Sequence, residues 1–262
     1  MSVWEALVLG FIQGATEFLP VSSSGHLVMG QALMNVRVPG VVFEVAVHVA
    51  TLVSVLLFYR KRVSGLIRGA VKGRKDAWRY VLLLCLATLP AACVGLGAGD
   101  FIEGLFDAPR VAGIGLLVTG TFLWTARWAL GRNPGTGPGI RTALLMGLAQ
   151  AFSIVPGVSR SGATVVTGLW LGVEAEEAAA FSFLMAVPAI LGAAVLELPE
   201  LAEAGSGLAG GALGVGVVAA ALTGILAIWT FVAMLRRKSF HRFGPYCWVV
   251  GGAFLIYLAM RG

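Results

Sequence analysis

The sequence predicts an all-α integral membrane protein: an inverted-topology repeat of six transmembrane helices plus two re-entrant helix–loop–helix hairpins that meet near the midplane. Three observations support this prediction. The 262 residues are 58% hydrophobic and only 12% charged, with a mean hydropathy of +0.89. Several apolar stretches reach the roughly 20 residues that a spanning helix needs. One polar motif occurs twice, and an offset of 137 residues superimposes the two copies, which indicates a duplicated unit.

Six continuous apolar stretches are expected to cross the membrane as helices. In chain order they are 42–59, 80–98, 110–130, 178–196, 208–235 and 244–260. Their connecting loops alternate in charge. The loops 60–79, 126–141 and 236–242 are basic, which places them on the cytoplasmic side. The intervening loops carry aspartate and glutamate and are therefore expected on the external side.

The two copies of the motif do not fit ordinary crossings. Pro20 in the first copy and Pro156 in the second stand beside serine and glycine within apolar sequence. Proline removes a helical hydrogen bond, and serine and glycine favour turns. Irregular backbone is tolerated at membrane depth only inside protein or beside a wet cavity. The segments 3–34 and 142–172 are therefore predicted to be re-entrant hairpins.

The chain is expected to form a single membrane domain, 1–262, with repeat 1 at about 1–131 and repeat 2 at about 138–262. Each repeat holds one hairpin and three crossings, and an odd number of crossings inverts the second copy. The first hairpin then enters from the external face and the second from the cytoplasmic face. The two broken tips are expected to meet.

Polar groups at the tips are costly in a bilayer and therefore point to function. Arg160 is a permanent cation whose planar fork suits phosphate. Helices that restart after a break offer backbone N–H groups and a positive dipole end to an anion. Hydroxyl donors come from Ser22, Ser23, Ser24, Ser159, Ser161 and Thr164. The tips are expected to bind an anion with several oxygens, and phosphate fits better than carboxylate.

Glu17 and His26 add reactive groups to the first tip. A carboxylate beside an anion is repulsive, so Glu17 is expected to hold a hard divalent cation such as Mg²⁺ or Ca²⁺, or to act as a general base. His26 is suited to be a nucleophile, an acid or a base. Simpler interpretations stay open: the motifs as helix kinks, His26 as a packed histidine, and Glu17 with Arg160 as mutual neutralisation.

The net charge of +6 does not indicate nucleic acid binding. Eight of the 19 basic residues lie between Arg60 and Arg79, beside an expected crossing, with only Asp76 opposing them. A cluster in this position marks the cytoplasmic side and indicates contact with anionic membrane lipids.

The two polar motifs resemble those of a known family. EFLPVSSSGH at 17–26 and PGVSRSGAT at 156–164 are similar to the two signature motifs of the bacterial undecaprenyl-diphosphate phosphatase family, the bacitracin-resistance type of integral membrane phosphatase. The resemblance extends over essentially the whole chain, including 43–52 and 181–188. It implies hydrolysis of undecaprenyl diphosphate to undecaprenyl phosphate and inorganic phosphate, which recycles the lipid carrier of cell-wall synthesis. It also implies the bacterial cytoplasmic membrane, an externally open active site and a divalent metal.

The resemblance assigns roles by position. Glu17 would be the essential carboxylate, with Ser23 and His26 in catalysis, and Arg160 would hold the diphosphate together with Ser159, Ser161 and Thr164. Gln13 stands where the family has the first acid of an acid-x-x-x-acid pattern, so the metal ligands would be Glu17 and the neutral oxygen of Gln13.

Some alternatives stay open on the residues alone. The attacking group is His26, Ser23 or a water oriented by Glu17. His48 is expected to face the site as a second layer behind these groups, and a packing role is an equal alternative. A transporter of lipid phosphates or anions shares this architecture, but a carrier has less need of a histidine and a glutamate together. The glycine-rich segment 205–216 would permit a homodimer.

Overall fold

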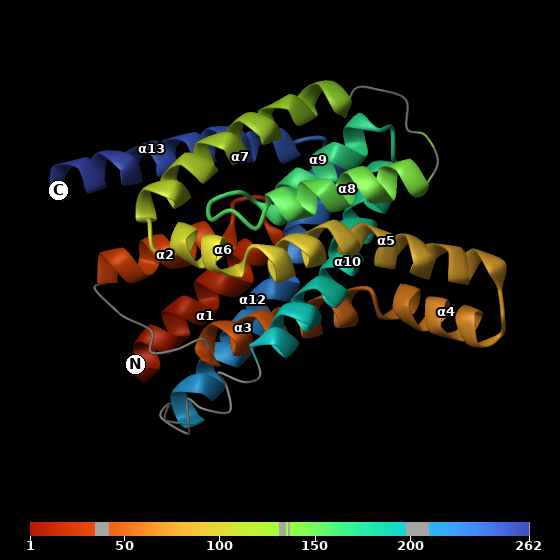
Figure 1. Cartoon of the computed structure of the whole chain (residues 1–262), viewed down its shortest axis with the longest axis horizontal. Coiled ribbons are helices and arrows are strands. Elements are labelled where there is room, and N and C mark those ends of the chain that lie inside the picture. The colour runs from red at the N-terminus through yellow and green to blue at the C-terminus, as the bar shows by residue number, and fades with distance from the viewer. Residues whose placement is uncertain (35–41, 131–134, 136, 198–209, 262) are drawn as a thin grey trace.

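The computed structural model of the chain is an all-α bundle (Figure 1). It describes residues 1–34, 42–130, 135, 137–197 and 210–261, and every regular element in these residues is a helix. The elements are α1 (Val3–Phe18), α2 (Ser23–Met34), α3 (Val42–Phe58), α4 (Arg60–Val71), α5 (Lys75–Gly97), α6 (Gly99–Phe106), α7 (Pro109–Ala129), α8 (Ile140–Phe152), α9 (Arg160–Trp170), α10 (Ala175–Leu196), α12 (Gly210–Arg236), the short 3-10 helix η1 (Phe240–Arg242) and α13 (Phe243–Arg261).

Most of the predicted crossings are helices of membrane-spanning length and composition. Among the described residues, α5, α10, α12 and α13 qualify individually, and α3 qualifies together with α4. The sixth predicted crossing, 110–130, forms α7, an unbroken helix of 21 residues that is not in this group. The threonines and arginines of α7 make it less apolar than the others. Residues 208 and 209, where one crossing was predicted to start, lie outside the described part of the chain.

The basic segment 60–79 is not the loop that its charge suggested. It folds into α4 and the first turns of α5, joined by a turn in which Gly73 has a φ of +68°. The axes of α3 and α4 differ by 80°. Apolar residues recur along one face of α4, which explains why a strongly basic segment is helical. The α4–α5 hairpin lies at one end of the long axis (Figure 1).

The first motif breaks the helix where the sequence predicts. α1 ends at Phe18, because Leu19 precedes Pro20 and takes the extended conformation that proline imposes on its neighbour (φ −64°, ψ 145°). α2 then returns along α1, so that Gly30 faces Ile12. Residues 3–34 are therefore a helix–loop–helix hairpin.

The second motif forms a matching hairpin. α8 ends at Phe152, α9 starts at Arg160, and between them Gly157 has a φ of +87°, which glycine adopts without strain. α9 returns along α8, with Gly168 against Met146. The hairpin spans 140–170 where the sequence predicted 142–172.

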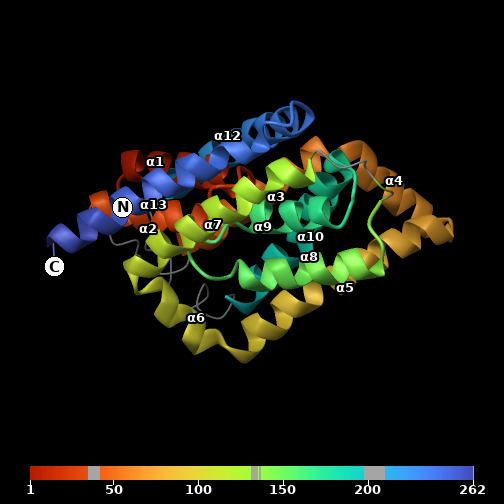
Figure 2. The same cartoon turned by 90° about the horizontal axis from the view of Figure 1, so that it is seen from above.

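Each hairpin packs against a long helix from the other half of the chain. α1 lies along α12, and α8 lies along α5. Figure 2 shows α1 and α12 on one side of the bundle and α5 and α8 on the other, with α3, α9 and α10 between them. This exchange is the arrangement expected of an inverted repeat. The repeat limits, 1–131 and 138–262, stay predictions.

Equivalent glycines of the two motifs make these contacts possible. Gly10 in α1 and Gly147 in α8 are related by the repeat offset. A Cβ atom on Gly10 would lie 2.3 Å from the carbonyl oxygen of Gly216, and one on Gly147 would lie 2.5 Å from that of Ala87. The backbones can approach this closely only without a side chain. Gly216 therefore packs against α1 within the same chain. The rest of the glycine-rich segment includes residues 205–209, which lie outside the described part of the chain. The homodimer stays a prediction.

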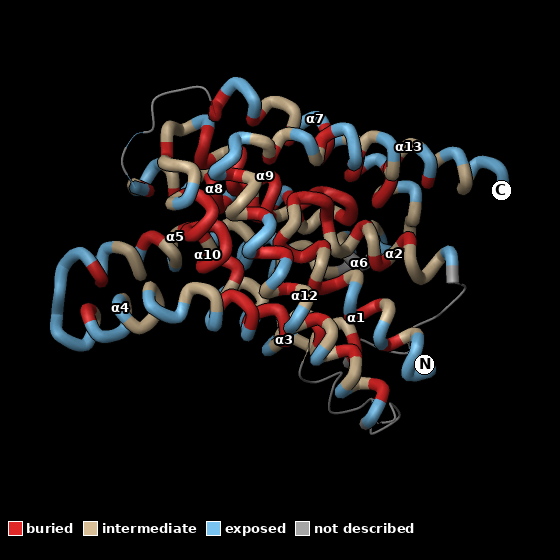
Figure 3. Tube along the Cα trace, turned by 180° about the vertical axis from the view of Figure 1, so that it is seen from behind, coloured by how far each residue is buried: buried red, intermediate tan, exposed pale blue. Residues whose placement is uncertain are grey.

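Aromatic rings connect the first hairpin to the second half. Phe18, at the end of α1, packs edge-on against Phe183 of α10, with ring centroids 5.4 Å apart. Phe183 contacts Phe231 of α12 at 5.1 Å, which contacts Phe240 of η1 at 5.2 Å. All four are fully buried, and each such burial contributes about 1.5–3 kcal/mol. Figure 3 shows the buried residues concentrated in the centre of the bundle, with α4 largely exposed.

Two ion pairs join helix ends that the charge pattern assigns to one side of the membrane. Arg62 of α4 makes a bidentate pair with Glu177 of α10, with both contacts at 2.6 Å. Arg236 of α12 pairs with Glu176 through two contacts of 2.9 Å. The start of α4, the start of α10 and the end of α12 are therefore neighbours, as the predicted topology requires.

Replacing either close-packed glycine by alanine is expected to separate the two halves. Gly10→Ala and Gly147→Ala should each lower the free energy of unfolding by about 1–3 kcal/mol, the usual effect of overpacking. The measurement is thermal unfolding in detergent. Gly214→Ala in α12 is the control, because a Cβ atom there meets none of the described residues within 4 Å. Equal melting temperatures for all three variants would contradict the packing argument.

Candidate active site

A buried ion pair joins the tips of the two hairpins. Glu17 lies in the last turn of α1, and Arg160 is the first residue of α9. The Oε1 atom of Glu17 accepts a hydrogen bond from Nη2 of Arg160. The two side chains are only 6% and 15% exposed. Opposite charges that are both taken out of water hold each other in place, so this contact fixes the tips together.

The other carboxylate oxygen of Glu17, Oε2, lies close to three residues from the first half of the chain. Oε2 accepts hydrogen bonds from Oγ of Ser23 at 2.6 Å and from Nε2 of Gln13 at 3.0 Å. Nε2 of His48, on α3, lies 3.8 Å from the same oxygen. Nδ1 of His48 donates to the carbonyl oxygen of Glu44 at 2.8 Å. In the neutral imidazole this bond leaves the Nε2 lone pair facing Glu17.

The serines shared by the two motifs are helix caps. Oγ of Ser22 accepts from the backbone N–H of Gly25 at 3.3 Å, and Oγ of Ser159 accepts from that of Gly162 at 3.1 Å. These four residues are related pairwise by the repeat offset. Each bond satisfies one free N–H of a helix N-terminus, the usual role of a serine N-cap. Ser22 takes a left-handed φ of 66°, a strained conformation of the kind found at functional sites.

The caps leave the N-termini of α2 and α9 at the tips. Ser23 and Arg160 are the first residues of these helices, and both bond to Glu17. A helix N-terminus carries a partial positive charge. The tips therefore combine one carboxylate, one guanidinium and two positive dipole ends, a balance that favours an anion.

Thr119 on α7 holds the second tip, and the sequence analysis missed it. Its hydroxyl donates to the carbonyl oxygen of Gly157 at 2.8 Å and accepts from the backbone N–H of Ser159 at 2.9 Å. Ser161 adds a contact across the tips through its hydroxyl, which donates to the carbonyl oxygen of Leu19 at 3.2 Å. A lone threonine in an apolar helix gives no signal that separates this role from ordinary packing.

A cavity of about 620 Å³ opens above the tips. Its polar floor is formed by Glu17, Ser22, Ser23, Ser24, His48, Gln150, Ser153, Ser159 and Arg160. Its walls are mostly apolar and come from α5, α6 and α10, from Ala91 to Phe106 and from Ala186 to Leu196. A charged floor under apolar walls suits a ligand with an anionic head and a hydrocarbon tail.

Four predicted site residues lie outside the cavity lining: Gln13, His26, Ser161 and Thr164. Gln13 is fully buried and donates a hydrogen bond to Glu17. Thr164 is fully buried, donates to the carbonyl oxygen of Arg160 and shares a 2.6 Å hydrogen bond with Ser182. The hydroxyl of Ser161 donates to the backbone carbonyl oxygen of Leu19. Nδ1 of His26 donates to the carbonyl oxygen of Ser22 at 2.8 Å, and Nε2 lies 2.9 Å from the hydroxyl of Tyr246, whose ring stacks on the imidazole.

Several buried polar atoms of the two hairpins have no protein partner within the described residues. They are Nη1 of Arg160, both side-chain amide atoms of Gln150 and Oε1 of Gln13. A buried polar atom without a partner is costly and calls for a ligand or water. Arg160 and Gln150 line the cavity, so their free N–H groups are available to an anion there.

The same residues do not make a ready metal site. The described residues hold no group of three histidine, cysteine, aspartate or glutamate side chains that could bind a metal ion. Glu17 is already in contact with Arg160, whose charge repels a cation, and Gln13 offers one neutral oxygen. Mg²⁺ and Ca²⁺ prefer several oxygen ligands. The Mg²⁺ or Ca²⁺ cofactor therefore stays a prediction.

Comparison with known proteins places this geometry in context. The family described as bacitracin resistance protein BacA matches residues 6–253. A protein of Desulforapulum autotrophicum is 38% identical over 96% of this chain and 96% of its own length. Proteins of Carboxydothermus hydrogenoformans and Salinibacter ruber are each 40% identical, over 98% and 96% of this chain and 97% and 98% of their own lengths. All three are named undecaprenyl-diphosphatase.

Removing one partner of the ion pair is expected to cost more than removing both. Glu17→Gln and Arg160→Gln each leave a buried charge uncompensated, a loss of about 3–5 kcal/mol of stability. The double variant should lose clearly less than the sum of the two. Unfolding in detergent of the wild type and the three variants measures the coupling. Additive losses would contradict direct contact between the tips.

A second carboxylate at residue 13 is expected to make the stability of the protein depend on divalent ions more strongly than in the wild type. In Gln13→Glu two buried carboxylates would lie one helical turn apart and repel each other. Without divalent ions this variant should melt at a lower temperature than the wild type, and Mg²⁺ or Ca²⁺ should restore much of the loss. Thermal unfolding with added Mg²⁺ or with chelator tests this. An equal Mg²⁺-dependent shift in wild type and variant would refute it.

Proposed function

Because the chain belongs to the bacitracin resistance protein BacA family, we propose that it hydrolyses undecaprenyl diphosphate to undecaprenyl phosphate and inorganic phosphate. The observation that supports this most strongly is the contact of Ser23, Glu17 and Arg160 at the floor of one cavity. The reaction recycles the lipid carrier of cell-wall synthesis and so confers resistance to bacitracin.

The floor of the cavity binds the diphosphate. Nη1 of Arg160, which has no protein partner in the described part of the chain, donates to the terminal phosphate, and the amide of Gln150 lies on the same floor. The N-terminus of α2 and that of α9 add backbone donors and positive potential. These groups also stabilise the charge that builds up on the phosphoryl oxygens in the transition state.

Ser23 is the nucleophile in this proposal. Its hydroxyl donates to Glu17, so the carboxylate is placed to take the proton as the oxygen attacks the terminal phosphorus. A Ser23 O–P bond forms, the bond from that phosphorus to the bridging oxygen breaks, and undecaprenyl phosphate leaves. Glu17 passes the proton on before the second step. Water then attacks the phosphoserine and gives a proton to Glu17, the Ser23 O–P bond breaks, and Glu17 returns that proton to the Ser23 oxygen as inorganic phosphate is released. His26, bonded to Ser22 and Tyr246, keeps the tip in shape.

His48 exchanges protons with Glu17. Its Nε2 lies 3.8 Å from Oε2 of Glu17 and lines the cavity, while the carbonyl oxygen of Glu44 holds its Nδ1–H. An imidazole in this position accepts the proton that Glu17 receives from Ser23. It can then return a proton to the leaving phosphate. His48 thus takes part directly in the proton transfers and does not merely support the residues that carry them out.

The apolar walls take the prenyl chain nearest the diphosphate. They are formed by α5, α6 and α10 near the ends that the charge pattern assigns to the external side, including Leu96 and Phe106. This supports an active site that opens externally in a bacterial cytoplasmic membrane.

The activity itself is tested by phosphate release from undecaprenyl diphosphate by the purified chain in detergent, with and without chelator. Release by the wild type is expected, and loss of release in Ser23→Ala. Ser239→Ala, away from the cavity, is the control variant. No release by folded wild type would reject the phosphatase and favour the transport of lipid phosphates.

The nucleophile is identified by trapping. Acid quenching during turnover of substrate labelled in the terminal phosphate is expected to leave label on Ser23, as a phosphoserine that survives acid. Peptide mapping locates the label. Acid-labile label on His26, or none in any quench, would overturn the role of Ser23.

His48→Gln is expected to lower kcat by about 100-fold, the usual scale of general acid–base catalysis, with little effect on KM. The variant should also lose the pH dependence that the imidazole imposes on kcat. His241→Gln, at η1, is the matched control. A wild-type pH profile in His48→Gln would show that His48 only packs.

A further inference from the structure

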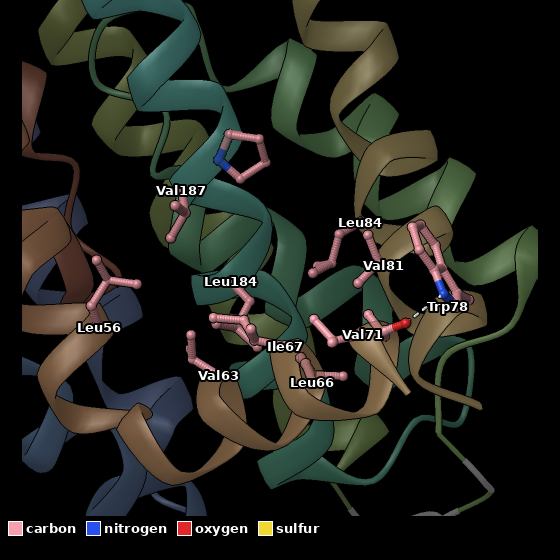
Figure 4. Close-up of a pocket in the computed structure, with 12 residues that line it drawn as sticks. Leu56, Val63, Leu66, Ile67, Val71, Trp78, Val81, Leu84, Leu184 and Val187 are labelled. Carbon is pink, nitrogen blue, oxygen red and sulfur yellow. Dashed lines mark hydrogen bonds between the residues drawn. The ribbon is translucent and has the colours of Figure 1, made fainter. Parts of the chain in front are cut away.

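A second cavity lies between α4 and the neighbouring helices α3, α5 and α10. It has a volume of about 450 Å³ and its lining is entirely apolar (Figure 4). The lining residues come from α3, α4, α5 and α10: Leu56, Val63, Leu66, Ile67, Ala70, Val71, Trp78, Val81, Leu84, Leu184, Val187 and Pro188. Several are exposed, including Val71 at 83% and Ile67 at 59%, so the cavity is an open groove.

The groove has a fixed wall. Nε1 of Trp78 donates to the carbonyl oxygen of Ala70 at 3.0 Å, which ties the start of α5 to the end of α4 (Figure 4). The pair of Arg62 with Glu177 ties the start of α4 to α10. Both ends of α4 are therefore anchored, and the groove between these helices does not depend on an occupant to exist.

Exposed cations are concentrated in the same segment, α4 and the start of α5, that supplies much of the groove lining. Of the eight basic residues between 60 and 79, Arg62 is paired with Glu177 and Arg74 with Asp76. The other six are exposed and have no carboxylate within ion-pair distance in the described part of the chain: Arg60, Lys61, Arg68, Lys72, Lys75 and Arg79. We name these six residues the basic rim.

We propose that the groove and the basic rim bind an anionic diacyl phospholipid of the membrane, with its acyl chain in the groove and its phosphate at the rim. An all-apolar groove at the membrane surface accepts hydrocarbon, and clustered lysine and arginine attract acidic headgroups. The proposed function places the diphosphate of the substrate at Arg160, so a phosphate at the basic rim would come from a different lipid. The site is therefore separate from the proposed catalytic centre.

The bound lipid would contact helices that also form the walls of the catalytic cavity. Pro188 of α10 lines both the groove and the catalytic cavity. Leu84 of α5 lines the groove, and Thr88, one turn further, lines the catalytic cavity. An acyl chain in the groove thus packs on the same two helices that form the walls of the active site.

Native mass spectrometry of the detergent-purified full chain tests the proposal with phosphatidylglycerol and phosphatidylcholine of identical acyl chains. One phosphatidylglycerol should be retained at least tenfold more tightly. Arg68→Gln with Lys72→Gln removes two rim charges and should weaken this binding about tenfold. Ala70→Trp fills the groove and should abolish it. Arg237→Gln with Arg242→Gln, two exposed cations elsewhere, should have no effect.

Equal retention of the two lipids, equal weakening by the control pair or unchanged binding in Ala70→Trp would overturn the proposal. Competition by undecaprenyl phosphate at equal affinity would also overturn it, since the groove would then belong to the substrate chain. Phosphate release by the same variants is measured in parallel. Loss of lipid binding with intact release, or the reverse, separates this site from the proposed phosphatase.

Discussion

The contact between Glu17 and Arg160 is the constraint on which the rest of the structure depends. It joins two segments 143 residues apart, each of which interrupts its helix where a membrane offers no water to its backbone. The capping serines and Thr119 of α7 satisfy backbone groups at the breaks, and the ion pair joins the two tips. The price is a buried charge on each side, which neither hairpin could carry alone.

Duplication supplied the scaffold, and divergence at matching positions supplied the chemistry. Ser22 and Ser159 make the same capping hydrogen bond, although Ser22 has a positive φ and Ser159 a negative one, so these two shared serines belong to the frame. The next residue is the first of the following helix in each copy: Ser23 in one, Arg160 in the other. The same place at a helix N-terminus thus carries the proposed nucleophile in one repeat and the anion-binding cation in the other. Both reach Glu17, and an inverted repeat makes that convergence possible.

The sequence predicted the features that follow from chain chemistry: the two breaks at proline, the hairpins and the meeting of their tips. It left the pairing of Glu17 with Arg160 as one of several open interpretations. It did not predict the features that need neighbours. α4 was expected as a loop because its charge masked an apolar stripe. Whether His26 faced the cavity could not be read from the sequence, since Tyr246, its partner, is 220 residues away. Thr164 looked like a ligand residue, but its hydroxyl is occupied by Ser182 and backbone.

The most direct test of a single site built from both tips is kinetic. It compares kcat/KM for phosphate release from undecaprenyl diphosphate in the wild type, Glu17→Ala, Arg160→Ala and the double variant. Residues that act as one unit are strongly non-additive, so the double variant should be scarcely slower than either single one. If the losses multiply, or if either single variant retains wild-type activity, the two tips do not form one catalytic centre.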